Sequence, residues 1–324
     1  MRSLWHGMGR TWLVALLACT LGGYPKAAGA QDLVKEALAA FPIQTSRVEY
    51  SSPARLRQIP NYRNLRQRFT GPNLKSLESS LAQLGIHEGD VDELVLGWGI
   101  GDPGSALYGL ASGRFDPKAV ADRAAAAGLA PSPVDEQQAY CLGTDSASIC
   151  VVVLGNSLGA FGPLPGLTAI LEARAGQAPS LNSDDRFTRL VGGVKRGPPI
   201  WGVAVGPAVG DWFKGWMPNQ EQIKLDWARV FGDVDSLVYS VRASQKADVE
   251  MLLNCSTPET AASLRQVLEG LKLAQQLAWQ TQNPNRANPF EGMNVGLTDQ
   301  QVSLQLTADF SQLEFDTGGG TAPH

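Results

Sequence analysis

The sequence contains an internal repeat, and this repeat limits the folds that the chain can adopt. VDELVLGW at 91–98 recurs as VDSLVYSV at 234–241, with four of the eight positions identical. Dipeptides that combine a helix-capping residue with proline, a signal for the start of a helix, flank both copies in the same order: Pro72-Asn73, Asp116-Pro117, Pro218-Asn219 and Thr257-Pro258. The spacings between equivalent markers, 146, 143 and 141 residues, differ little. We therefore expect one structural unit that has been duplicated.

The content of the unit follows from its patterns. An opening strand is predicted at 47–51 in the first copy and at 200–206 in the second, and a closing hairpin at 140–154 and 293–306. Each unit of roughly 130 residues then has the order β-α(α)-β-β-α-β-β, which indicates the α+β class, with helices on one face of a largely antiparallel sheet. The sequence leaves open whether the two sheets join.

The chain divides into five predicted segments. These are a signal peptide, a first α+β unit with an N-terminal helix, a connection, a second α+β unit and a tail, at 1–30, 31–176, 177–197, 198–315 and 316–324.

The N-terminus has the pattern of a secretory signal peptide. Arg2 and Arg10 precede the apolar stretch 11–23, and Ala28-Gly29-Ala30 offers a cleavage site. We expect cleavage after Ala30 and a periplasmic or extracellular location. A stretch of 13 residues is shorter than the roughly 18 that span a membrane, so the mature chain should have no transmembrane segment. The alternative is a lipoprotein anchored at Cys19, because LLAC at 16–19 resembles a lipobox.

The charge of the mature chain argues against nucleic acid as a partner. Without residues 1–30 the chain has 24 basic and 31 acidic residues, a net charge of −7. One arginine-rich stretch, 55–69, departs from this balance. It is interpreted either as a solvated helix face or as a phosphate or anion patch formed by Arg55, Arg57, Arg63, Arg66 and Arg68.

The cysteines suit an oxidising compartment. If Asp145-Ser146 forms a tight turn, Cys141 and Cys150 lie opposite each other on two paired strands, close enough for a disulfide. Cys255 would then be left over, most simply as a buried apolar residue, although its pairing stays open.

GNSLG at 155–159 follows a run of valines, as the nucleophilic serine does in an α/β-hydrolase. That turn requires a helix directly after the serine, but prolines and glycines follow Ser157. The fold also requires a histidine later in the chain, and only His324 in the terminal tail qualifies. We therefore interpret 155–159 as a turn, with catalysis by Ser157 as a weak alternative.

The acidic stretch 87–93, HEGDVDE, contains residue types that bind metal ions. It lacks the ligand spacing of a calcium loop, and zinc would lack further histidine or cysteine ligands. We expect a connection between helix and strand here and no metal. No phosphate-binding loop, dinucleotide fingerprint or redox motif is present, so no cofactor is expected.

The aromatic cluster at 212–217 is the remaining candidate site. Packing in the core is the default interpretation for such residues. An exposed anchor for a partner, formed by Trp212, Phe213, Trp216 and Met217, is the alternative.

Together these patterns predict an exported, non-catalytic protein of the envelope or the cell exterior that binds a protein partner or a ligand. A secreted hydrolase using a serine or carboxylates is the alternative. The sequence indicates neither the partner nor the oligomeric state.

Overall fold

The computed structural model describes residues 30–60, 62, 72–99, 107–143, 148–195, 197–216, 226–244 and 246–309. The strands that precede the connection are β1 (Thr45–Ser51), β2 (Val91–Gly99), β3 (Leu107–Gly113), β4 (Pro131–Val134), β5 (Gln137–Leu142), β6 (Ile149–Val153) and β7 (Leu158–Gly162). The later strands are β8 (Ile200–Val205), β9 (Val234–Ala243), β10 (Lys246–Cys255), β11 (Asn294–Thr298) and β12 (Gln301–Asp309).

The described α-helices are α1 (Ala30–Ala40), α2 (Pro53–Leu56), α4 (Pro72–Gln83), α5 (Pro117–Ala126), α6 (Leu164–Arg174), α7 (Asp185–Gly193), α8 (Ala208–Trp216), α9 (Trp227–Phe231) and α10 (Pro258–Gln282). Two short 3₁₀ turns, η2 (Glu88–Asp90) and η3 (Leu181–Ser183), complete the elements.

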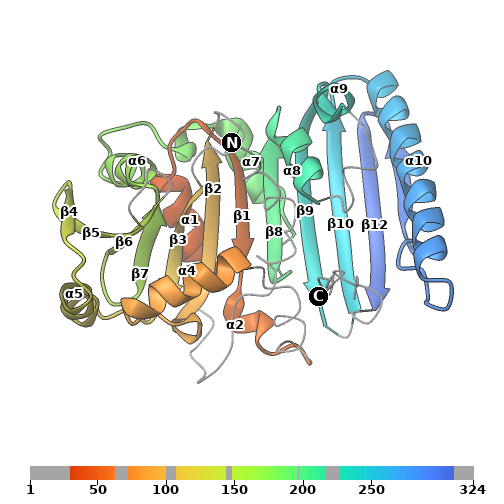
Figure 1. Cartoon of the computed structure of the whole chain (residues 1–324). Helices are drawn as coiled ribbons and strands as arrows, with labels where there is room; N and C mark the ends of the chain where they lie inside the picture. Colours follow the sequence, from red (N-terminus) through yellow and green to blue (C-terminus); the bar gives the residue numbers. More distant parts are fainter. Residues whose placement is uncertain are drawn as a thin grey trace, which may run out of the picture.

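All twelve strands form one sheet, in the order β11-β12-β10-β9-β8-β1-β2-β3-β7-β6-β5-β4 (Figure 1). Each neighbouring pair is antiparallel. The two halves join where β1 pairs with β8, with Arg47 opposite Ala204 and Ser51 opposite Ile200. The predicted α+β class with an antiparallel sheet is confirmed, and the open question is answered: the halves share one sheet.

The strand order is mirrored about the β1–β8 pair. β1, β2 and β3 lie in order on one side, and β8, β9 and β10 lie in order on the other. The mirrored order continues for one more hairpin, because β3 pairs with β7 and β10 pairs with β12, and only the first half then adds β5 and β4. The expected match between 140–154 and 293–306 is therefore wrong. The hairpin β6–β7 occupies the place of β11–β12, and the prediction missed β4 and β7. The duplication itself stays a prediction.

Helices cover both faces of the sheet. Residues of α8, α9 and α10 pack on one face of the second half, and residues of α4 and α5 on the same face of the first. Figure 1 shows α4, α8 and α10 in front of the strands. These helices lie within the repeat units, on one face as expected. The opposite face of the first half is covered by α1, α6 and α7, so the one-face arrangement does not describe the whole chain.

The helix starts test the capping predictions. The Asp116 carboxylate accepts bonds from the amides of Lys118 and Ala119, and Thr257 caps α10, both as predicted. In the second unit the described helix α9 begins after Asp226, whose side chain accepts from the Arg229 amide. The proposed opening at Pro218-Asn219 lies outside the described residues. In the first unit α4 already begins at Pro72.

Candidate functional site

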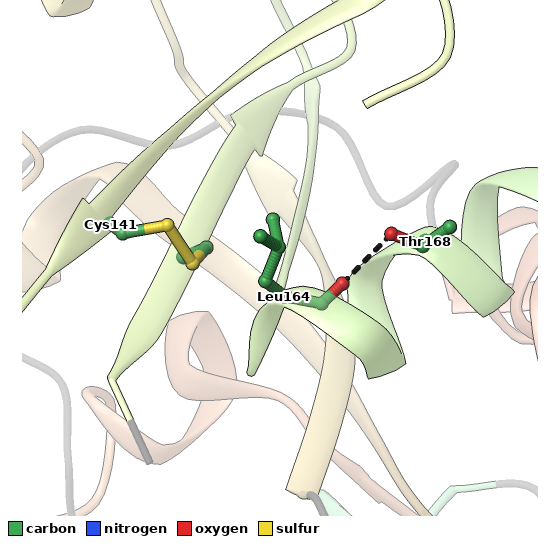
Figure 2. The surroundings of a disulfide bond; sticks show 4 residues. Cys141, Leu164 and Thr168 are labelled. Carbon is green, nitrogen blue, oxygen red and sulfur yellow. Dashed lines mark hydrogen bonds between the residues drawn. A yellow bond between two sulfur atoms is a disulfide. The ribbon is translucent and has the colours of Figure 1, made fainter. Parts of the chain in front are cut away.

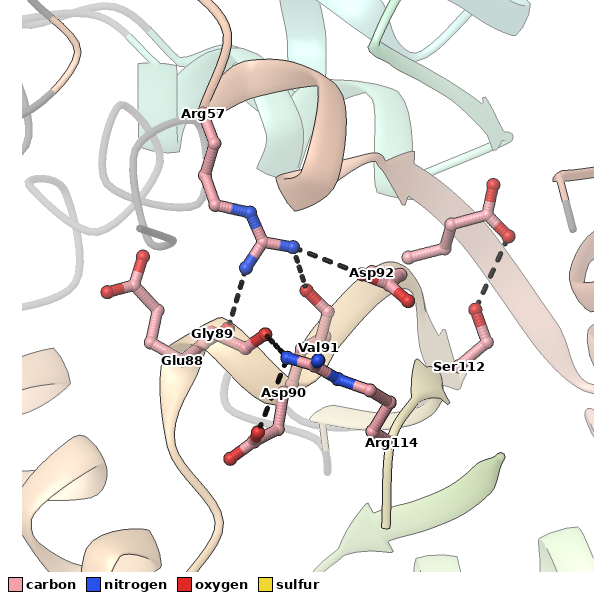
Figure 3. A network of polar contacts seen from close by, with 9 residues as sticks. Arg57, Glu88, Gly89, Asp90, Val91, Asp92, Ser112 and Arg114 are labelled. Carbon is pink, nitrogen blue, oxygen red and sulfur yellow. Dashed lines mark hydrogen bonds and ion pairs between the residues drawn. The ribbon is translucent and has the colours of Figure 1, made fainter. Parts of the chain in front are cut away.

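The arginine-rich stretch and the acidic stretch meet at the start of β2 (Figure 3). Arg57, the residue directly after α2, donates from Nη2 to the carbonyl of Val91 at 2.9 Å and to Asp92 Oδ1 at 3.2 Å. Its Nη1 donates to the carbonyl of Glu88 at 3.3 Å. Because one guanidinium bonds two carbonyls and a carboxylate of the same turn, Arg57 fixes the turn that leads into β2.

A second arginine holds the same turn from β3. Arg114 Nη2 donates to the carbonyl of Gly89 at 3.1 Å and lies 3.9 Å from Asp90 Oδ1. The His87 amide donates to Asp90 Oδ2 at 2.9 Å. No group of three or more His, Cys, Asp or Glu side chains in the described part of the chain is arranged to hold a metal ion. The acidic stretch is the predicted helix-to-strand connection.

The structure describes two of the five arginines proposed as an anion patch. Arg57 is hydrogen-bonded to the acidic turn. Arg55 is exposed and donates to the carbonyls of Gly197 and Pro198, the latter at 3.5 Å. Arg63, Arg66 and Arg68 lie outside the described residues.

Arg55 also lines a pocket that is open to solvent, called the cavity below, where residues of the two halves meet. The cavity has a volume of about 340 Å³ and is bounded by residues after α2, by Pro199 before β8 and by the turn at Ala243-Ser244. The described residues that line it include no acidic side chain.

The aromatic cluster lies in the core. Trp212 is 4% exposed and Phe213 is 1% exposed. The two rings contact each other edge to face, and Phe213 stacks on Phe231 with 4.3 Å between ring centroids. An exposed anchor made from these two residues is therefore wrong, because neither side chain reaches the surface. Trp216 ends α8, but its side chain and Met217 lie outside the described residues.

Trp212 belongs to a buried polar cluster that sequence reasoning missed. The Trp212 indole N–H donates to Glu49 Oε1 at 3.2 Å, and the hydroxyl of Tyr239 and the guanidinium of Arg47 donate to the same oxygen. Arg47 also stacks over the ring of Trp98, 4.4 Å from its centroid. Glu49 thus connects α8, β9 and β1, which come from both halves.

Burial dominates the electrostatics of this cluster. Arg47 is 4% exposed and Glu49 is 7% exposed. Loss of hydration raises the pKa of Glu49, and the charge of Arg47 opposes that shift. The same loss of hydration lowers the pKa of Arg47. Both side chains are enclosed in the core, where Glu49 links β1 of the first half to α8 and β9 of the second.

Glu93 is a second buried carboxylate. It lies on β2, close in sequence to the acidic turn. The Tyr50 hydroxyl donates to Glu93 Oε1 at 2.8 Å, and the Ser112 hydroxyl donates to Oε2 at 3.3 Å. Burial raises the pKa of Glu93, and the two hydrogen bonds oppose this rise.

Glu93 predicts a pH dependence of stability. Because its pKa is higher in the folded chain than in the unfolded one, its contribution is complete below pH 4.5 and is lost as the pH rises through the folded pKa. We expect the stability of the wild type relative to Glu93→Gln to decrease between pH 4 and pH 7. Urea unfolding at intervals of one pH unit measures this difference. A difference that stayed constant or increased would contradict the prediction.

Ser157 lies in the turn that precedes β7. The backbone carbonyls of Asn156 and Ser157 accept bonds from the amides of Phe115 and Gly113, which attach this turn to the end of β3. The segment that follows is a strand, not a helix, so the strand-turn-helix geometry of a hydrolase nucleophile is absent here. The interpretation of this segment as a turn is confirmed.

The predicted disulfide is present. Cys141 and Cys150 are opposed on β5 and β6 and are joined through their sulfur atoms. Figure 2 shows the bond together with the first turn of α6, where the Thr168 hydroxyl donates to the carbonyl of Leu164 at 2.9 Å. Cys255 is buried in the second half and is free.

Removing the disulfide should lower stability measurably. For Cys141→Ser/Cys150→Ser we expect a loss of about 2–3 kcal/mol, because the bond closes a short loop, nine residues apart in sequence, in the unfolded chain. Urea unfolding of both proteins measures the change, and wild type under reducing conditions is the control. Equal midpoints for wild type and variant would contradict it.

Comparison with known proteins adds a fold but no family. No family model and no curated protein matches the chain. Two crystal forms of TP0453 are similar in structure. Form III has 9% identity and a TM-score of 0.51, covering 86% of this chain and 95% of that chain. Form I has 7% identity and a TM-score of 0.50, covering 86% and 94%. The chain therefore shares the overall fold of TP0453.

Proposed function

We propose that the chain is exported to the periplasm or the cell exterior and acts there as a non-catalytic protein that binds a partner or a ligand. The observation that carries this proposal is that the side chains considered for catalysis or ligand binding contact other parts of the chain. Arg57 and Arg114 bind the acidic turn, and a strand follows Ser157 where a hydrolase nucleophile would require a helix. Glu49 is occupied by three donors inside the core. The two arginines and Glu49 therefore have structural tasks.

Two features support export. The Cys141–Cys150 disulfide is the kind of bond that persists in oxidising compartments. The first 30 residues have the charge and apolar pattern of a signal peptide. Among the described residues, no helix is both long and apolar enough to cross a membrane.

Expression of the full chain in a Gram-negative host tests the export. We expect release by osmotic shock, an N-terminus at Gln31 and one alkylatable thiol after unfolding, Cys255. Replacement of Ala28 and Ala30 by lysine should block cleavage and serves as the control. An uncleaved chain in the cytosol would refute the proposal. A lipid on Cys19 would keep the export and replace the free mature protein with an anchored one.

A fluorophosphonate probe tests the non-catalytic part of the proposal. We expect no labelling of the purified chain, with a known serine hydrolase as the positive control. Labelling of wild type that disappears in Ser157→Ala would establish the hydrolase instead.

A further inference from the structure

We propose that the cavity at Arg55 binds a small organic anion with an apolar body, such as a medium-chain carboxylate. This assignment rests on the proposed binding function and makes the ligand class specific. It also confines the anion site to one arginine of the 55–69 stretch.

The position of the cavity favours a ligand site. Its walls come from the segment after α2 in the first half, from Pro199 before β8, and from Ser244 between β9 and β10 in the second half. Small-molecule sites occur preferentially where two units meet. The volume of about 340 Å³ lies at the lower end of the usual range for such sites, so the ligand must be small.

The polar lining favours a negative head group. Among the described residues that line the cavity, Arg55 is the one with a charge, and Gln58 and Ser244 supply an amide and a hydroxyl. Arg55 has no ion pair with a carboxylate in the described part of the chain, although its charge acts to lower the pKa of Glu93. Its Nη atoms bond the carbonyls before Pro199 and leave Nε–H as a further donor. These bonds hold the guanidinium in place before a ligand arrives, which lowers the entropy cost of binding.

The remaining lining favours an apolar body. Ile59, Pro60, Pro199 and Ala243 have aliphatic side chains, which carry no hydrogen-bond donors. A strongly hydrated inorganic anion would satisfy Arg55 but gain nothing from these side chains. A carboxylate with an alkyl chain uses both parts of the lining, since burial of each methylene contributes about 0.8 kcal/mol.

A titration of the purified full chain with octanoate tests the site. We expect saturable binding by calorimetry, with shifts of the Gln58 and Ser244 amide resonances. Acetate provides the head without the body, and octylammonium provides the body with the opposite charge. Both should bind at least tenfold more weakly than octanoate. Equal binding of octanoate and octylammonium would overturn the proposal, as would no saturable binding of octanoate at millimolar concentration.

Variants locate the binding. Arg55→Gln should weaken octanoate binding at least tenfold, because a hydrogen bond between charged groups is lost. Arg229→Gln, which changes an exposed arginine on α9, is the matched control and should leave the affinity unchanged. If Arg55→Gln does not fold, Ser244→Trp blocks the cavity from an exposed turn and should have the same effect. Unchanged affinity in the folded cavity variants would overturn the assignment.

The result of the octanoate titration can be distinguished from the result of the export experiment. The titration uses purified protein and does not depend on export, so failure to bind octanoate leaves the export result intact. Likewise, a cytosolic chain that binds octanoate would refute the export and keep the cavity site.

Discussion

Glu49→Ala is expected to lower the free energy of unfolding by about 3–5 kcal/mol, because it removes one partner of a buried ion pair. The oxygen Oε1 of Glu49 accepts bonds from Arg47, Tyr239 and Trp212, so truncation takes the acceptor away from three donors in the core. A loss of this size is a large share of the 5–15 kcal/mol that typically stabilises a folded protein. Urea unfolding followed by tryptophan fluorescence measures it.

The double variant Arg47→Met/Glu49→Met separates the charge from the packing. Replacing both members of a buried pair with apolar side chains of similar size commonly costs little, because neither charge then has to lose its hydration. We expect the double variant to be more stable than Glu49→Ala. A loss below about 1 kcal/mol in Glu49→Ala would show that this cluster does not hold the two halves together.

Much of the fold could be predicted because its signals are local. The repeated strand motif at 91–98 and 234–241 coincides with β2 and β9, and Asp116 and Thr257 cap the helices that follow. The pairing of Cys141 with Cys150 followed from turn length alone. Strands β4 and β7 were missed because prolines and glycines interrupt them and hide the alternation of a strand.

The buried cluster could not be predicted, because its burial depends on distant contacts. RVEYS at 47–51 alternates charged and apolar residues, a pattern typical of a strand with one face in water. In the structure β1 is the central strand that joins the halves, so its charged face is buried too. Two of the three donors to Glu49, Trp212 and Tyr239, are 163 and 190 residues away in sequence. Only a sequence signal that β1 pairs with a strand on both of its edges would have revealed the buried cluster.

A glycine in β8 shows how closely this cluster is packed. Gly202 lies directly between Glu49 on β1 and Tyr239 on β9 in the strand register. The Tyr239 ring crosses over Gly202 to reach Glu49, and a Cβ atom at position 202 would lie 2.4 Å from Cε1 of that ring. Contacts between carbon atoms are favourable at about 3.5–4.0 Å, so the ring could not stay in place.

Gly202→Ala is therefore expected to destabilise the chain by about 3 kcal/mol. Overpacking a core costs typically about 1–3 kcal/mol, and moving Tyr239 also weakens its hydrogen bond to a charged acceptor. The matched control is Gly270→Ala in α10, where nothing lies within 4 Å of the new Cβ and alanine should stabilise the helix by up to about 1 kcal/mol. The same substitution should thus shift the urea midpoint down at 202 and up at 270. If Gly202→Ala left the midpoint unchanged, Tyr239 could move without cost, and its bond to Glu49 would not link the two halves.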